Sequence, residues 1–97
     1  MRLVLHPKVY SDIDEIVGYD ERVATPGLAE EFYTKLRYFV TKAADKPESF
    51  SILERDIRRE NLRRFPYHFL FRVVGDKVRI LVVRHHHRHP FFGSAQR

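Results

Sequence analysis

Residues 68–85 read HFLFRVVGDKVRILVVRH, which is two runs of apolar and β-branched residues separated by Gly75 and Asp76. Two such runs joined by two residues, with glycine first, predict a β-hairpin with strands at 68–74 and 77–85. Each strand needs a buried surface for one of its faces. The remainder of the chain therefore has to supply the layer that covers this hairpin.

A two-residue turn determines which residues of the two strands face each other. An uninterrupted register then places His68 opposite Val83 and Arg72 directly opposite Arg79. Two arginines in this position repel each other, and an anionic partner would relieve that repulsion. The register also separates the side chains of the hairpin into two faces, because alternate residues of a strand point to opposite sides.

The two predicted faces differ sharply in character. One is wholly apolar, and we expect it to lie against helices; it consists of Phe69, Phe71, Val73, Val78, Ile80 and Val82. The other mixes basic and aliphatic side chains and is our candidate partner-binding surface; it consists of His68, Leu70, Arg72, Arg79, Leu81, Val83 and His85.

The covering layer is predicted from the first half of the chain. Residues 2–5 form a β-prone run, and Pro7 is well placed as the first residue of a helix over about 7–22. Asp12 lies between the apolar positions of this helix, and we expect it to face water. The pair Thr25-Pro26 predicts the start of a second helix, with Thr25 as its N-cap.

The second helix is expected to end at Asp45, because the residue before Pro47 is disfavoured in the helical region. Its apolar stripe and the short link predict an antiparallel helical hairpin. Residues 49–59 are expected to form a loop with a short strand or turn at about 50–53, and a strand is expected over 60–65. We also expect Tyr67 to be a core aromatic, and Arg63 or Arg64 to pair with acidic residues of the helices.

Composition restricts the class of protein. The 97 residues suffice for a single domain, 1–97, and the absence of cysteine excludes disulfides, thiolate nucleophiles and Cys-ligated metals. No apolar run is long enough for a membrane span, so we expect a cytoplasmic protein. The 18 Lys and Arg against 13 Asp and Glu give +5, and the excess lies in the second half. Such an arginine-rich half indicates an acidic or polyanionic partner.

Residues 62–73, the turn 75–76, the strand 78–83 and the His/Arg segment that ends at Pro90 together resemble the RelE/ParE superfamily of type II toxin–antitoxin toxins. The resemblance extends over the whole chain. It implies an α+β fold with an N-terminal strand, an antiparallel helical hairpin and then a three- to four-stranded antiparallel sheet. It also implies a single toxin domain that inhibits growth and is neutralised by a cognate antitoxin.

Two activities share this fold. RelE-like members cut messenger RNA in the ribosomal A site without a metal, whereas ParE-like members poison DNA gyrase. RelE-like toxins have an arginine directly after the tyrosine that opens the first hairpin strand, where this chain has His68. The Phe-Pro-Tyr opening and the ending formed by His85, Arg88 and Pro90 are more similar to the ParE-like branch, which we favour.

The RelE-like alternative predicts a catalytic set for metal-free cleavage. Such cleavage needs an acid, a base and a cation that stabilises the phosphorane. The candidates are His86 and His87 as acid or base, with Arg84, Arg88 and Arg63 as cations.

The remaining expectations concern partners and metals. We expect the antitoxin to be acidic and partly disordered, and to form a hetero-oligomer with this chain. The cellular target is then DNA gyrase or the ribosome with its messenger RNA. His85, His87 and His89 alternate, but no cysteine or carboxylate accompanies them in the sequence, so no native metal site is predicted. No motif indicates a cofactor.

Overall fold

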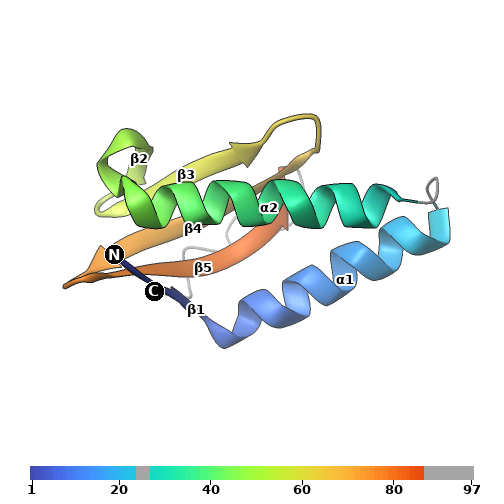
Figure 1. Ribbon diagram of the computed structural model, residues 1–97, viewed down its shortest axis with the longest axis horizontal. Helices are drawn as coiled ribbons and strands as arrows, with labels where there is room; N and C mark the ends of the chain where they lie inside the picture. The colour runs from blue at the N-terminus through green and yellow to red at the C-terminus, as the bar shows by residue number, and fades with distance from the viewer. Residues whose placement is uncertain (24–26, 87–97) are drawn as a thin grey trace.

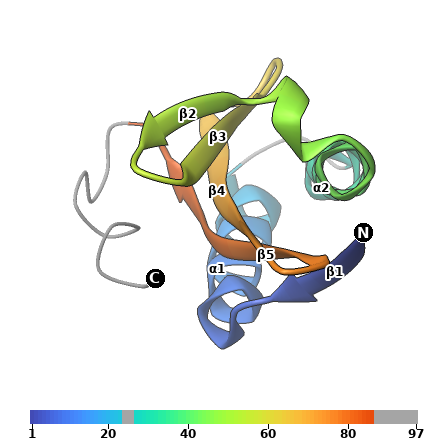
Figure 2. The ribbon, with the colours of Figure 1, turned by 90° about the vertical axis from the view of Figure 1, so that its left-hand side faces the viewer.

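The computed structural model of the chain describes residues 1–23 and 27–86. Within these ranges, two antiparallel helices pack on a five-stranded sheet (Figures 1 and 2). The elements are β1 (Arg2–Leu5), α1 (Pro7–Val23), α2 (Leu28–Asp45), the short 3-10 helix η1 (Pro47–Ser49), β2 (Ser51–Glu54), β3 (Ile57–Leu62), β4 (Tyr67–Val74) and β5 (Lys77–His85). No helix in the described ranges is long and apolar enough to cross a bilayer.

The two helices begin differently. At α1, the Nδ1 of His6 accepts a hydrogen bond from the backbone N–H of Lys8 at 3.0 Å, so His6 caps the helix ahead of Pro7. At α2, the residue before the helix is Gly27, whose φ of 91° favours glycine. The helix therefore starts at Leu28, later than a Thr25 N-cap would place it, and Thr25 itself lies outside the described residues.

The sheet has the order β1-β5-β4-β3-β2. Strands β2 to β5 are antiparallel neighbours, as expected. The N-terminal strand β1 joins the opposite edge in parallel with β5, so Arg2 lies opposite Lys77 and Leu5 opposite Ile80. The complete sheet is thus mixed.

Strand β3 spans Ile57–Leu62, three residues earlier than the 60–65 predicted. The chain leaves the sheet at 63–66, where Arg64 has a left-handed φ of 76° and Pro66 has no N–H to donate to a neighbouring strand. Of the strand or turn expected near 50–53, the strand forms as β2, although β3 begins within the predicted loop 49–59. The hairpin strands β4 and β5 match their predicted spans closely.

The hairpin register differs from the predicted one beyond Ile80. Close to the Gly75 turn the predicted pairs form, and Arg72 lies opposite Arg79. Between Leu70 and Phe71 the register shifts, because β5 carries one extra residue there. His68 therefore lies opposite Arg84, one residue beyond the predicted Val83.

The main core joins both helices to one face of the sheet. Val9 and Ile16 of α1 and Phe32, Leu36 and Phe39 of α2 pack with the hairpin side chains Phe69, Phe71, Val78, Ile80 and Val83. Val82 was expected among them, but the bulge turns it to the outer face and puts Val83 in its place. Tyr67 is a core residue, as predicted.

Asp12 does not face water. Its side chain is 6% exposed, and its Oδ2 accepts the backbone N–H of Val83 at 3.0 Å, while its Oδ1 pairs with Lys8 at 2.7 Å. Strand β1 has already ended at Leu5, so no strand among the described residues pairs with this part of β5 on that side. Asp12 therefore supplies the acceptor that a neighbouring strand would otherwise supply.

Candidate functional site: a basic cluster on the outer face of the sheet

Four basic side chains gather on the sheet face opposite the main core. Arg59 comes from β3, His68 from β4, Arg84 from β5, and His86 directly follows β5. The Nε–H of Arg84 donates to Nε2 of His68 at 2.9 Å, and Nδ1 of His68 lies 2.9 Å from Nδ1 of His86. The Nη2 of Arg59 is 3.5 Å from the same His86 nitrogen. We call these four residues the basic cluster.

The β5 bulge is what assembles the basic cluster. In the uninterrupted register, Val83 would lie opposite His68 and Arg84 would point towards the helices. The extra residue reverses this order beyond Ile80, so Arg84 lies opposite His68 on the outer face.

The two histidine rings lie side by side in nearly one plane. Their planes differ by 11°, and their centroids are 5.1 Å apart. The Nδ1–Nδ1 distance of 2.9 Å is too short for stacked ring faces and fits one N–H···N hydrogen bond. Nε2 of His68 accepts from Arg84, so it carries no proton, and Nδ1 of His68 is assigned as the donor to His86.

The environment of His68 disfavours its charged form. Burial is the largest cause, followed by the positive charges of Arg59 and Arg84, and together these lower the pKa of His68 from 6.5 to about 3. Burial and Arg59 also lower the pKa of the Arg84 guanidinium. His68 is therefore neutral at physiological pH and acts as a fixed connector between Arg84 and His86.

This protonation state predicts a pH dependence of stability. Below pH 6.5 the unfolded chain binds a proton at His68 that the folded chain excludes, so the free energy of unfolding falls as the pH drops from 6.5 towards 3. The loss from this one residue is about 1.4 kcal/mol per pH unit in that window.

The variant His68→Gln tests this dependence. Glutamine keeps an acceptor for Arg84 and a donor for His86 but cannot gain a charge, so its unfolding free energy is expected to lack this slope. Urea unfolding of both proteins between about pH 7 and pH 5 measures the difference. Parallel pH profiles would contradict a His68 that is neutral in the folded state.

The predicted partner-binding surface is only partly present. Leu70 and Leu81 lie on the expected face, but each is 0% exposed and packs with Ile57 and Val82 in a small second core. His68 lies on that face too and is 1% exposed. These three side chains are therefore buried in the structure, because the outer face of the sheet has its own core.

Two further members of that surface lie on the opposite face. Val83 packs in the main core, and the ring of His85 lies edge-on to Tyr67 with centroids 5.4 Å apart. The reason is again the bulge, which reverses the facing of every β5 residue after it.

The arginine pair of the hairpin is partly compensated within the chain. Both Nε and Nη2 of Arg72 donate to Oδ2 of Asp56, at 3.1 and 2.7 Å. Arg79 is partly buried, and its Nε is a buried donor for which the described residues provide no acceptor. Asp56 thus offsets the charge of Arg72, whereas the Nε of Arg79 lacks an acceptor among the described residues.

Only some of the predicted catalytic candidates lie together in the structure. Arg84 and His86 belong to the basic cluster, whereas Arg63 is exposed in the turn 63–66, outside it. His87 and Arg88 lie outside the described residues. Arg64, in the same turn, pairs with Glu31 of α2 at 2.9 Å, which confirms the predicted contact with a helix acid.

Arg59 is the member of the cluster that the sequence analysis missed. A strand placed at 60–65 leaves Arg59 in a loop, whereas the observed β3 puts it opposite Leu70 on the outer face. Its Nε also donates to Asn61 at 2.9 Å. The alternation of Ile57, Arg59 and Asn61 was the available signal, since it continues the outer face of β4.

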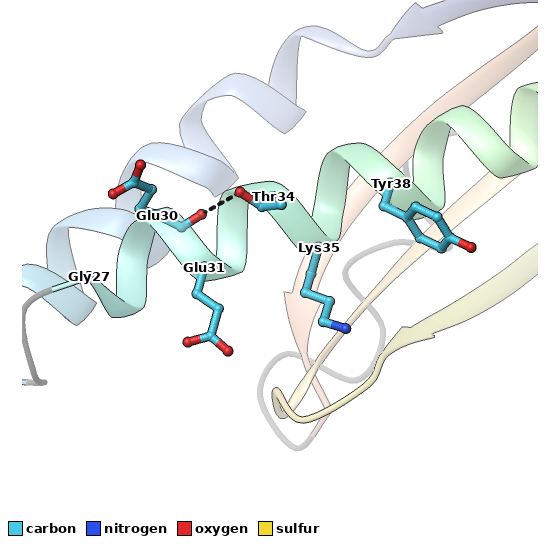
Figure 3. Close-up of a pocket in the computed structure, with 6 residues that line it drawn as sticks. All are labelled: Gly27, Glu30, Glu31, Thr34, Lys35 and Tyr38. Atoms are coloured by element: carbon cyan, nitrogen blue, oxygen red, sulfur yellow. Dashed lines mark hydrogen bonds between the residues drawn. The ribbon is translucent and has the colours of Figure 1, made fainter.

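A separate hollow lies on the exposed side of α2 (Figure 3) and is lined by Gly27, Glu30, Glu31, Thr34, Lys35 and Tyr38. The hydroxyl of Thr34 donates back to the carbonyl of Glu30 at 3.0 Å, and Glu31 is engaged by Arg64. None of the predicted site residues lines it. Among the described residues, no group of three or more His, Cys, Asp or Glu side chains is placed to hold a metal ion.

Comparisons with known proteins agree with the predicted fold. A family model described as "ParE toxin of type II toxin-antitoxin system, parDE" matches residues 3–90. The structure is similar to one described as the chromosomal ParDE TA system from P. aeruginosa, with a TM-score of 0.77 and 22% identity over 88% of this chain and 95% of that chain. No curated protein sequence matches the chain.

RelE structures are also similar. The isolated E. coli RelE toxin gives a TM-score of 0.61 and 15% identity, covering 97% of this chain and 93% of that chain. A chain of the intact E. coli RelBE toxin–antitoxin complex gives a TM-score of 0.57 and 15% identity, covering 84% of this chain and 92% of that chain. At these identities the likeness demonstrates a shared α+β fold and confirms the predicted fold class.

Proposed function

The chain belongs to the ParE toxin family of type II toxin–antitoxin systems, and from this premise we propose that it inhibits growth by poisoning DNA gyrase. A cognate antitoxin neutralises it in the cytoplasm. This function requires a docking surface for the target and one for the antitoxin, and it requires no catalytic group on the toxin.

The proposal rests on one observation, which is that His68 is neutral and buried. The resemblance implies that RelE-like toxins have an arginine directly after the strand-opening tyrosine, and metal-free cleavage needs a cation that stabilises the phosphorane. Here that position holds a neutral histidine that is 1% exposed and has both ring nitrogens engaged, one by Arg84 and one by His86. Because both ring nitrogens are already in hydrogen bonds, neither is available to bind a phosphate or to transfer a proton.

A second candidate is the RelE-like ribosome-dependent nuclease, favoured by the basic cluster itself. Arg59 and Arg84 could hold a phosphate, and His86 or His87 could act as acid or base. In this reading Arg63 and Arg88 would add further cations. His68 would then position Arg84 and His86 without touching the RNA.

Two measurements separate these functions. Purified chain added to DNA gyrase, supercoiled plasmid and ATP is expected to produce linear DNA, and brief induction in cells is expected to switch on the DNA-damage response. The double variant His86→Ala/His87→Ala is expected to keep both effects. Primer extension that instead finds A-site cuts in messenger RNA, lost in the double variant, would overturn the gyrase proposal in favour of the nuclease.

We further propose that the antitoxin is acidic and partly disordered, and that it forms a hetero-oligomer with this chain. The +5 net charge supports an acidic partner. Sequencing the neighbouring reading frame and co-expressing its product test this: growth should recover, and the two proteins should purify together. A neighbouring antitoxin with a basic C-terminal half would contradict the proposal.

A further inference from the structure

The bulge in β5 leaves the end of the hairpin with two registers to choose from. Strands β4 and β5 lie side by side (Figure 2), and their pairing is continuous from the turn to Phe71 and Ile80. Beyond that point Phe69 pairs with Val83, because β5 contains one extra residue. We call this pairing the bulged register. In the uninterrupted register, which has no extra residue, Phe69 would pair with Val82.

The main core does not distinguish the two registers. In the bulged register Val83 packs in the main core and Val82 in the second core. The uninterrupted register would exchange the two, so a valine would again enter the main core. Asp12 does not distinguish them either. It accepts the N–H of the residue opposite Phe69, which is Val83 here and would be Val82 in the other register.

His68, in contrast, is satisfied in one register only. Its ring is 1% exposed, its Nε2 accepts from Arg84 at 2.9 Å, and its Nδ1 lies 2.9 Å from Nδ1 of His86. Arg84 and His86 alternate along the chain, so a slip by one residue would turn both towards the helices. Val83, which would then lie opposite His68, has no polar side chain. His85 would move to the outer face beyond the start of β4, where it could serve one nitrogen at most.

A buried polar side chain disfavours every arrangement that leaves it without hydrogen-bond partners. A buried asparagine fixes the register of coiled coils in this way. We propose that His68 selects the bulged register, and that its hydrogen bond with Arg84 is the contact that the uninterrupted register cannot keep. His68 is thus a positioning residue. This role is the same whether the target is gyrase or messenger RNA, because it concerns the pairing of two strands.

The choice of register determines which face of the sheet carries the charges of the strand end. In the bulged register Arg84 and His86 lie on the outer face beside Arg59, and the basic cluster is complete. In the uninterrupted register both would leave that face, and Arg59 would remain there without them. The basic cluster therefore depends on His68 for its assembly.

Nuclear Overhauser effects (NOEs) between the strands measure the register directly. The N–H of Val83 donates to Asp12, so Phe69 and Val83 form a non-hydrogen-bonded pair, the kind whose Cα atoms lie closest in an antiparallel ladder. The bulged register therefore gives an NOE between the Hα protons of Phe69 and Val83. The uninterrupted register gives one between Phe69 and Val82 instead. The wild-type chain is expected to show the first alone.

The variant His68→Val removes both buried nitrogens and inserts a β-branched side chain that suits a strand. The ratio of the uninterrupted to the bulged register is expected to rise about a hundredfold or more, because neither nitrogen now needs a partner. The NOE between Phe69 and Val82 should then appear. His68→Gln is the matched control, since it keeps an acceptor for Arg84 and a donor for His86, and it is expected to keep the bulged register.

His68→Val decides the question if it folds. An NOE between Phe69 and Val83 alone in this variant would overturn the proposal and assign the bulge to the second core. If His68→Val does not fold, Arg84→Leu takes its place, because leucine removes the donor and can lie against the helices. The same change of NOE is expected, and its absence would overturn the proposal. Loss of folding in both variants would show that the pair supports the fold without choosing between registers, which also overturns it.

Discussion

Replacing Phe32 with alanine is expected to lower the free energy of unfolding by about 3–5 kcal/mol. The ring is 0% exposed and makes edge contacts with Phe65 and Tyr67, at centroid distances of 5.7 and 5.4 Å. It therefore joins α2 to the turn between β3 and β4. A domain of this kind is stable by about 5–15 kcal/mol in total, so much of that stability depends on this one side chain.

Urea unfolding followed by circular dichroism measures this loss. Tyr33→Ala is the matched control, since the neighbouring residue is similar in size but 46% exposed, and we expect it to cost less than about 1 kcal/mol. Equal losses in the two variants would mean that α2 does not face the sheet through Phe32.

The second large effect is expected at Asp12. Asp12→Ala removes the acceptor of the Val83 N–H and leaves a buried donor unsatisfied, at a cost of about 2–3 kcal/mol. It also removes the ion pair between Asp12 and Lys8. Because Val83 lies just beyond the bulge, we expect the last residues of β5 to loosen before the rest of the sheet.

Native-state hydrogen exchange of the Val83 amide measures that local effect, together with the global unfolding free energy. Asp14→Ala, two residues along the same helix and exposed, is the control and should be nearly neutral. Asp12→Asn keeps an acceptor oxygen and is expected to lie between the two. A neutral Asp12→Ala would show that solvent or another group satisfies the Val83 N–H.

Local signals predicted most of the elements. The Gly75-Asp76 turn located the hairpin, the apolar stripe located α2, and Pro47 located its end, because each of these effects acts within a few residues. The family resemblance supplied the order of the elements and the presence of an antitoxin partner.

The candidate site was predicted less well because it depends on long-range geometry. One extra residue in β5 determines whether Arg84 or Val83 meets His68, and no residue in VRILVVRH marks a bulge. Asp12 looked like a solvent-facing helix acid because its acceptor role depends on Val83, 71 residues away. Both errors arose where pairing between distant segments overrides local pattern.

The parallel pairing of β1 with β5 also affects how the protein is made. Arg2 pairs with Lys77, so β1 cannot take its place in the sheet until β5 has been synthesised. At about 5–20 residues per second, roughly 4–15 s separate the synthesis of the two strands. During translation the chain therefore has an incomplete sheet. The complete sheet can form only after Lys77–His85 has left the ribosome.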